Sequence, residues 1–151
     1  MGIVLYGEDD ANDAFFMERA FAKLGRREAL RIVPNGGIAV QYLEGAGKFA
    51  DRSQYPDPSL LLLDVKMPEV SGLEALAAVR RRVAFAAIPV AMFTSSTQAT
   101  DIAFCRAHGA NAYLVKPSNA AGLAPLVEGL LRAIERFSVE SPRLAIDGNL
   151  L

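Results

Sequence analysis

Acidic side chains gather behind two apolar segments of this 151-residue chain. Glu8, Asp9 and Asp10 follow the apolar segment 3–6, and Asp64 follows four consecutive leucines at 60–63. Clustered carboxylates repel one another, and a hard divalent cation with oxygen ligands, such as Mg²⁺, relieves that repulsion. The sequence therefore predicts a magnesium site where these side chains meet.

A hydroxyl and a lysine stand behind two further apolar segments. Thr94 follows the segment 89–93, and Lys116 follows the segment 112–115. An aspartate beside a bound cation can act as a nucleophile and accept a phosphoryl group as an acyl phosphate. The Lys116 ammonium and the Thr94 hydroxyl could then bind the phosphoryl oxygens. The set of residues indicates phosphoryl transfer to Asp64.

The elements that would position these residues alternate along the chain. Strands are predicted at 3–6, 30–33, 60–63, 89–93 and 112–115. Helices are predicted from an N-cap at Asp10 to Gly25, over 38–43, from Leu73 through Leu76 and Ala77 to Val83, over 98–108 and over 123–137. Right-handed crossovers make this alternation an α/β fold, with a doubly wound five-stranded parallel sheet flanked by five helices. Ligands of such sheets bind beyond the carboxyl ends of the strands.

Composition narrows the function classes. The chain has 16 Lys and Arg against 17 Asp and Glu, a net charge of −1, which gives no global field for binding nucleic acid. The single cysteine, Cys105, excludes an internal disulfide and fits a cytoplasmic location. We find neither a signal peptide nor an apolar run of about 20 residues, so no membrane association is expected.

The candidate site residues and their spacing resemble those of a known family, over residues 2–137. The acidic pair Glu8-Asp9, the run Leu-Asp-Val-Lys-Met-Pro around Asp64, Thr94 and the pair Lys116-Pro117 resemble the receiver domains of two-component response regulators. The intervals of 30 residues from Asp64 to Thr94 and 22 from Thr94 to Lys116 are typical of that family. The acidic start and the long loop 44–59 are similar to stand-alone receivers of the chemotaxis-regulator type, including those that serve phytochrome-type histidine kinases.

The resemblance implies a phosphoacceptor and a metal site. Asp64 would accept the phosphoryl group from a sensor histidine kinase or a phosphotransfer protein. Glu8, Asp9, Asp64 and the backbone carbonyl of Lys66 would hold Mg²⁺. The family fold is the flavodoxin-like receiver fold, which agrees with the alternation of strands and helices.

The resemblance also implies a switch. Lys116 would contact the phosphoryl group, and its bond to Pro117 would be cis. Thr94 would move toward the phosphoryl group while the ring of Tyr113 turns inward. Ser95, a small residue, would leave the site open to phosphodonors.

The domain organisation is expected to be simple. Residues 1–137 form the receiver domain, and residues 138–151 form a partly ordered C-terminal tail with no output domain. A signal would then leave through contacts with another protein or with a second copy in a homodimer. Apolar tail residues such as Leu144 and Ile146 could dock on the domain or on the second copy.

Three alternatives remain open at this point. A phosphatase of haloacid-dehalogenase-like type would also use an aspartyl phosphate, but it has a second Asp where this chain has Lys66. A nucleotide- or flavin-binding module would need a phosphate-binding loop after the first strand, where three carboxylates would repel the ligand. A pseudo-receiver would act through protein contacts alone, which the complete acceptor site argues against.

Overall fold

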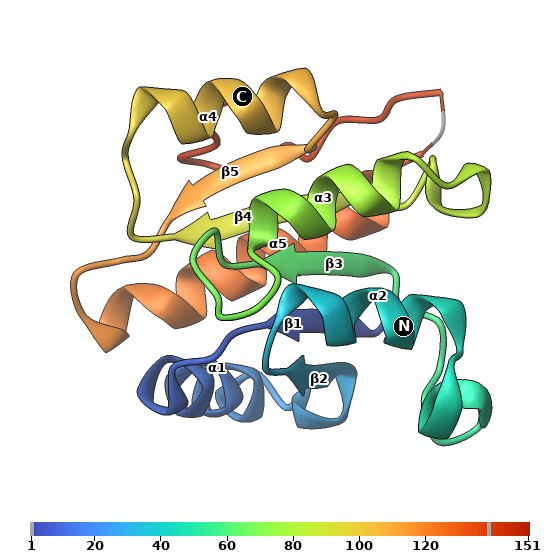
Figure 1. Cartoon of the computed structure of the whole chain (residues 1–151). Helices are drawn as coiled ribbons and strands as arrows, with labels where there is room; N and C mark the ends of the chain where they lie inside the picture. The colour runs from blue at the N-terminus through green and yellow to red at the C-terminus, as the bar shows by residue number, and fades with distance from the viewer. Residues whose placement is uncertain (1, 139) are drawn as a thin grey trace.

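The computed structural model describes residues 2–138 and 140–151; Met1 and Val139, within the predicted receiver domain and tail respectively, lie outside the described residues. Five parallel strands form one sheet in the order β2-β1-β3-β4-β5 (Figure 1). The strands are β1 (Val4–Gly7), β2 (Leu30–Val33), β3 (Leu60–Leu63), β4 (Val90–Thr94) and β5 (Ala112–Val115). The predicted doubly wound parallel sheet is confirmed.

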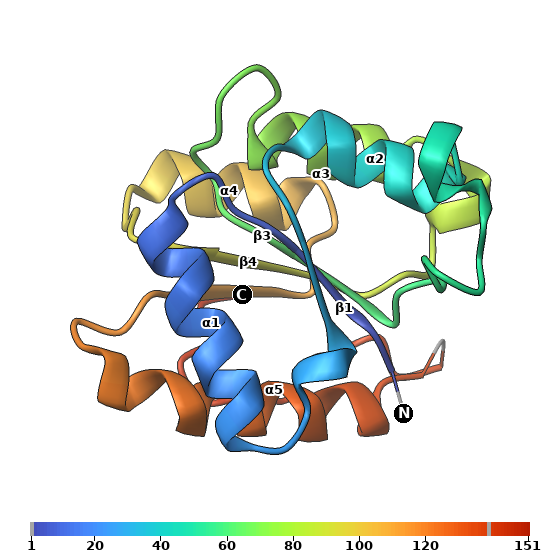
Figure 2. The same cartoon turned by 90° about the horizontal axis from the view of Figure 1, so that it is seen from below.

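Five helices cover the two faces of this sheet. They are α1 (Ala11–Lys23), α2 (Gly36–Glu44), α3 (Gly72–Arg80), α4 (Ala99–Ala107) and α5 (Leu123–Arg136), with short 3₁₀ turns η1 (Arg27–Ala29), η2 (Gly47–Ala50), η3 (Val83–Phe85) and η4 (Ala120–Gly122). Helices α1 and α5 lie on one face, and α2, α3 and α4 lie on the other (Figure 2). The sheet is therefore the middle of three layers, with one apolar core on each side.

The leucine run at 60–63 occupies the centre of the sheet because both of its faces are covered. In β3, Leu60 and Leu62 pack into the core beneath α1 and α5, while Leu61 and Leu63 pack into the core beneath α2 and α3. All four side chains are fully buried. Continuous apolar runs are typical of strands in parallel sheets, where neither face meets water.

Local capping fixes where two helices begin near the carboxyl ends of the strands. The side chain of Asp10 accepts hydrogen bonds from the backbone N–H groups of Asn12 and Asp13, so α1 begins as predicted. Ser71 and Glu74 form a reciprocal capping box at the start of α3. An acidic residue directly follows the strand that precedes each of these helices, Glu8 after β1 and Asp64 after β3.

Gly72 allows α3 to pack directly against the end of β3. A Cβ atom at position 72 would lie 1.9 Å from the backbone oxygen of Asp64, which no side chain can tolerate. The Gly72 N–H donates to the carbonyl of Val65 at 3.0 Å. Because Gly72 has no side chain, the start of α3 packs directly against the backbone of Asp64 and Val65.

One element differs from the sequence prediction. The third helix was expected to reach Val83, but α3 ends at Arg80 and the Val83 side chain, in η3, is 95% exposed. The Arg80 guanidinium donates to the carbonyls of Phe85 and Gly109. These bonds need the chain to turn back directly after α3, so Val83 projects outward.

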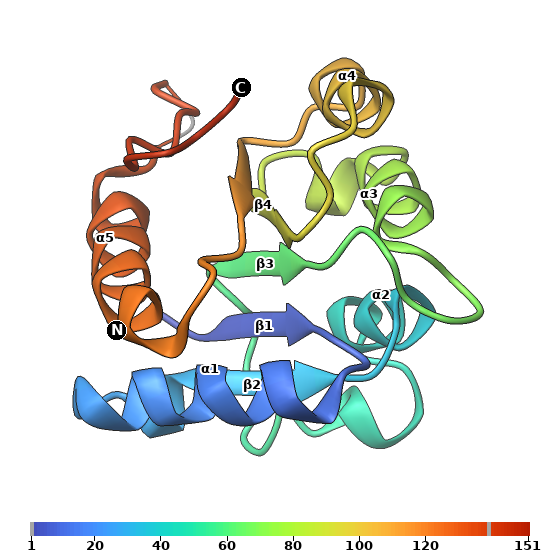
Figure 3. The ribbon, with the colours of Figure 1, turned by 90° about the vertical axis from the view of Figure 1, so that its left-hand side faces the viewer.

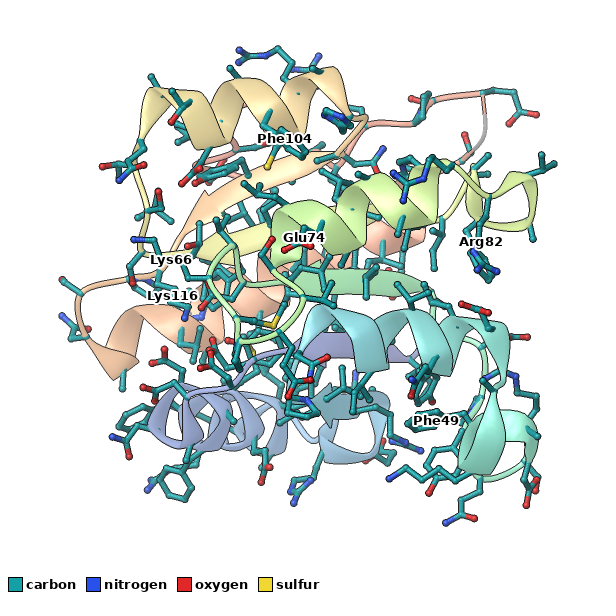
Figure 4. The ribbon with its side chains drawn as sticks, viewed as in Figure 1. Phe49, Lys66, Glu74, Arg82, Phe104 and Lys116 are labelled. Carbon is teal, nitrogen blue, oxygen red and sulfur yellow. The ribbon has the colours of Figure 1, made fainter. Side chains whose placement is uncertain are left out.

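The long loop 44–59 is ordered by one arginine. Arg52 donates to the carbonyls of Tyr42 and Leu43 at the end of α2, at 2.8 and 2.7 Å. The Phe49 side chain, labelled in Figure 4, is buried against the ring of Tyr42. Across residues 2–138 and 140–151, no helix has the length and apolar character needed to cross a membrane.

Burial on both faces predicts that truncating the central strand is costly. We expect Leu62→Ala to lower the free energy of unfolding by about 2–5 kcal/mol, because it removes buried methyl groups and leaves a cavity. The matched control is Val83→Ala, which should change the value by less than about 0.5 kcal/mol because Val83 is exposed. Urea denaturation measures both, and similar losses in the two variants would contradict the assigned burial.

Candidate functional site

The carboxyl ends of β1, β3 and β5 bring acids and one lysine together. The Lys116 Nζ, behind β5, lies 2.7 Å from Glu8 Oε1, behind β1, and 2.7 Å from Asp64 Oδ2, behind β3. Its third partner is Asp13 Oδ2 in α1, at 2.8 Å. Figure 4 labels Lys116 and Lys66 on the side of the molecule to which the strand arrows point. The predicted convergence of Glu8, Asp64 and Lys116 is thus present.

Asp13 is a member of this group that the sequence did not reveal. Its position suggested only a favourable charge in the first turn of α1. Capping by Asp10 sets the rotation of the first turn, and Asp13, three residues later, turns toward Lys116. The signal available in the sequence was this spacing of three residues after the cap.

Tyr6 supports the group from inside β1. Its hydroxyl donates to Glu8 Oε1 at 2.7 Å, since residues two apart on a strand lie on the same face. Burial raises the pKa of Tyr6 well above its ordinary value, and the neighbouring Glu8 carboxylate raises it further. The Tyr6 hydroxyl therefore remains a proton donor, and the sequence reading of Tyr6 as part of an apolar strand missed this role.

Opposing effects set the charge of the lysine and of its most buried partner. Burial alone would lower the pKa of Lys116, but the hydrogen bonds that it donates to Asp13, Asp64 and Glu8 outweigh this effect, and the net shift of the pKa is upward. Burial raises the pKa of Glu8, and the bonds from Lys116 and Tyr6 oppose that shift. Lys116 is therefore charged at all physiological pH values.

The group is typical of a divalent metal site. Glu8, Asp13 and Asp64 each offer a carboxylate oxygen, and these oxygens lie within 4.8 Å of one another. One ammonium faces three carboxylates, so it compensates their charge only in part. Hard cations with oxygen ligands suit such a set.

Asp9 and Lys66 lie at the mouth of the site rather than inside it. Both side chains are exposed, and both line a shallow concavity of about 540 Å³. The Lys66 N–H donates to Asp64 Oδ1 at 3.3 Å, so the backbone after β3 folds over the Asp64 carboxylate. Asp64 itself is buried, with 7% of its surface exposed.

The predicted switch residues form one hydrogen-bonded series. The Ser96 N–H donates to Thr94 Oγ1 at 3.2 Å, and the Tyr113 hydroxyl donates to the Ser96 carbonyl at 2.9 Å. Thr94 and Tyr113 are both buried, with the ring of Tyr113 turned inward. Burial raises the pKa of Tyr113, although its bond to Ser96 opposes the shift. Ser95, which lies between Thr94 and Ser96 in the sequence, is exposed. This exposure is compatible with the open access for phosphodonors that its small side chain suggested.

One expectation from the family resemblance is wrong. The bond between Lys116 and Pro117 was expected to be cis, but the described residues contain no cis peptide bond. The trans form is favoured by about 0.5–1 kcal/mol before proline. Lys116 reaches all three carboxylates with the trans bond, so the cluster does not need the cis form.

Comparison with known proteins decides the family. A family model for the response regulator receiver domain matches residues 17–128, well over half of the chain. The chain belongs to the response regulator receiver family. It is therefore a phosphoacceptor switch of two-component signalling rather than a turnover enzyme, which sets aside the phosphatase alternative, and the family implies a histidine kinase as partner.

Three relatives are similar over almost their whole length. The response regulator Rcp1 of Synechocystis sp. is 28% identical over 142 residues, which cover 94% of this chain and 92% of Rcp1. The crystal structure of the Mn²⁺-bound form of Rcp1 matches with a TM-score of 0.73 and 27% identity, over 86% of this chain and 91% of Rcp1.

The other two are also known from crystal structures. RPA3017, a response regulator in red light signaling of R. palustris, has a TM-score of 0.80 and 31% identity, over 87% of this chain and 92% of its own. The phosphorylated cyanobacterial phytochrome response regulator RcpA has a TM-score of 0.77 and 27% identity, over 85% and 89%. The acidic start and the long loop 44–59 predicted a similarity to stand-alone receivers, including those that serve phytochrome-type histidine kinases. This similarity is confirmed.

Removing the Lys116 ammonium from the cluster should lower the free energy of unfolding, by an amount that depends on pH. We expect Lys116→Met to lower the free energy of unfolding by about 3 kcal/mol at pH 7, because Glu8 and Asp64 lose their buried partner. The loss should shrink toward pH 5. Burial raises the pKa of Glu8 in the folded state, so the folded variant takes up a proton before the unfolded chain does.

Urea denaturation at the two pH values checks this, with Lys23→Met as the control because Lys23 is exposed on α1. A loss in Lys116→Met that is the same at pH 7 and pH 5 would contradict the role of Glu8.

Proposed function

We propose that Asp64 accepts a phosphoryl group from the phosphohistidine of a sensor histidine kinase or a phosphotransfer protein, with Mg²⁺ bound beside it. The observation that carries the proposal is the contact of Asp64 Oδ2 with Lys116 Nζ at 2.7 Å inside a group of carboxylates. An acidic nucleophile, a fixed cation and a hydroxyl at one rim are the parts that phosphoryl transfer to a protein requires.

In the proposed transfer, one carboxylate oxygen of Asp64 attacks the phosphorus. The new bond joins this oxygen to phosphorus, the bond from phosphorus to the histidine nitrogen breaks, and that nitrogen keeps the electron pair. Lys116, a fixed positive charge, stabilises the phosphoryl oxygens where charge accumulates. Ser95 leaves room for the donor because its side chain is small and exposed.

Mg²⁺ is proposed to be held by Glu8, Asp9, Asp64 and the backbone carbonyl of Lys66. Asp9 and Lys66 line one concavity, and the Lys66 N–H donates to Asp64 Oδ1 at 3.3 Å, which supports these two as ligands beside Asp64. When bound, Mg²⁺ supplies charge stabilisation for the phosphoryl oxygens. Asp13 in α1 pairs with Lys116 at 2.8 Å and adds a further carboxylate close to Glu8 and Asp64.

Thr94 and Tyr113 are proposed to report the phosphoryl group to the rest of the molecule. Thr94 accepts a hydrogen bond from Ser96, and its own hydroxyl proton can be donated to a phosphoryl oxygen. Tyr113 is tied to the same residue, Ser96, through its hydroxyl. Phosphorylation would then favour one arrangement of this series and change protein contacts by a population shift.

The proposed biological setting follows from the relatives. A phytochrome-type histidine kinase is the proposed upstream partner, and a homodimer is a proposed output. The net charge of −1 supports a protein rather than a nucleic acid as the target. The buried free thiol of Cys105, whose pKa burial raises to about 12, supports a reducing cytoplasmic location.

Acetyl phosphate with Mg²⁺ tests the acceptor. We expect the native chain to gain the mass of one phosphoryl group and Asp64→Asn to gain none, because only the native chain has the nucleophile. Asp57→Asn is the matched control, since the Asp57 side chain is 80% exposed in a distant loop. Intact-protein mass spectrometry measures all three, and labelling of Asp64→Asn would overturn the assignment.

The metal ligands are tested by a pair of neighbouring substitutions. We expect Asp9→Asn to weaken Mg²⁺ binding at least tenfold, because a charged ligand becomes a neutral amide. Asp10→Asn should bind Mg²⁺ like the native chain, since Asp10 serves α1 as its cap and Asn caps equally well. Calorimetric titration with Mg²⁺ measures both, and equal affinities of the two variants would remove Asp9 from the metal site.

A further inference from the structure

The segment 140–151 returns from α5 along the outer edge of the sheet. Strand β5 pairs with β4 on one side only, so its other side is an edge. The segment lies beside that edge, between α5 and α4 (Figure 3). The tail that was expected to be partly ordered is thus packed against the domain.

Hydrogen bonds at Tyr113 hold the segment to the edge. The Tyr113 N–H donates to Asn149 Oδ1 at 3.0 Å, and the Leu150 N–H donates to the Tyr113 carbonyl at 3.1 Å. Asn149 Nδ2 donates to the carbonyl of Asn111 at 3.2 Å. Both outward backbone groups of Tyr113 are therefore occupied by residues 149 and 150.

Apolar contacts and one arginine add to these bonds. Leu144 is 1% exposed and belongs to the core beneath α5. Leu151 packs at the other end of the segment, against the core that contains Tyr113. Arg106 of α4 donates to the Leu150 carbonyl at 3.0 Å. The segment thus contacts the two helices that flank β5 as well as the strand itself.

Tyr113 connects this segment to the candidate site. Its backbone holds Asn149 and Leu150, while its hydroxyl holds the Ser96 carbonyl. The Ser96 N–H in turn bonds Thr94 Oγ1, which leaves the Thr94 proton available to a phosphoryl oxygen. One residue therefore positions both the docked segment and the inward arrangement that Thr94 would use.

We propose that residues 144–151 form a clasp on β5 whose docking is coupled to phosphorylation of Asp64. The proposal rests on the acceptor role of Asp64 proposed above. The docked clasp and the phosphorylated site favour the same inward position of Tyr113, so each stabilises the other. Because coupling between two sites is reciprocal, the phosphoryl group tightens the clasp and the clasp strengthens binding at the site.

Amide hydrogen exchange tests the first direction in the native chain. With Mg²⁺ and beryllofluoride, a mimic of the phosphoryl group, we expect the Leu150 amide to exchange at least fivefold more slowly than without them. The coupling energies typical of linked sites correspond to factors of about 5 to 150. This measurement needs no variant, so a folding defect cannot obscure it.

Variants test the reverse direction. Asn149→Ala should bind beryllofluoride with Mg²⁺ about fivefold more weakly than the native chain, because the clasp loses its bonds to Tyr113 and Asn111. Asp147→Ala, an exposed neighbour in the same segment, should bind it like the native chain. Unchanged exchange at Leu150, or equal affinities of Asn149→Ala and the native chain, would overturn the clasp.

Failure of the clasp is distinguishable from failure of the acceptor assignment. A native chain that takes up a phosphoryl group from acetyl phosphate, with Leu150 exchange unchanged, keeps the acceptor and rejects the clasp. A native chain that takes up no phosphoryl group at all rejects the acceptor, and the clasp with it.

Discussion

The ammonium of Lys116 ties three carboxylates from different parts of the chain into one cluster. Glu8 follows β1, Asp13 lies in α1 and Asp64 follows β3, and each contacts Nζ at 2.7 or 2.8 Å. Burying a lysine or a carboxylate alone is costly, so each group is stable here only with the others present. Because the strands are parallel, in the order β1-β3-β4-β5, these side chains meet at the carboxyl ends of the strands. One lysine compensates the charge of three carboxylates only in part. The remaining negative charge attracts a divalent cation to this cluster.

The site has a buried base and an exposed mouth. Gly72 lets the backbone of α3 touch the backbone of Asp64, and Thr94 is buried beneath the opening. Lys66 and Ser95, by contrast, are exposed. A nearly buried carboxylate with exposed neighbours suits the proposed role of Asp64 as the acceptor of a phosphoryl group from another protein.

Much of this arrangement was predictable from the sequence. The strands at 30–33, 60–63 and 112–115 were placed correctly because buried parallel strands appear as short apolar runs between turn residues. The convergence of Asp64 and Lys116 followed from topology alone, since parallel strands end at one edge. Such inferences need only the order of elements, which local patterns reveal.

Several of the errors and omissions depend on contacts between distant residues. Asp13 faces Lys116 because of how α1 lies on the sheet, and the last residue of α3, Arg80, bonds to the carbonyl of Gly109, far along the chain. The docking of the tail depends on Asn149, which has no periodic pattern around it. These contacts become apparent only when the elements are assembled.

The covered edge at β5 has a consequence for the behaviour of the protein in concentrated solution. An open strand edge offers unpaired N–H and C=O groups on which another chain can add a strand, and this is a common start of aggregation. Asn149 and Leu150 occupy these groups at Tyr113, so the chain shields its own edge from other molecules. Protection of this edge therefore depends on the same few hydrogen bonds that the proposed clasp uses.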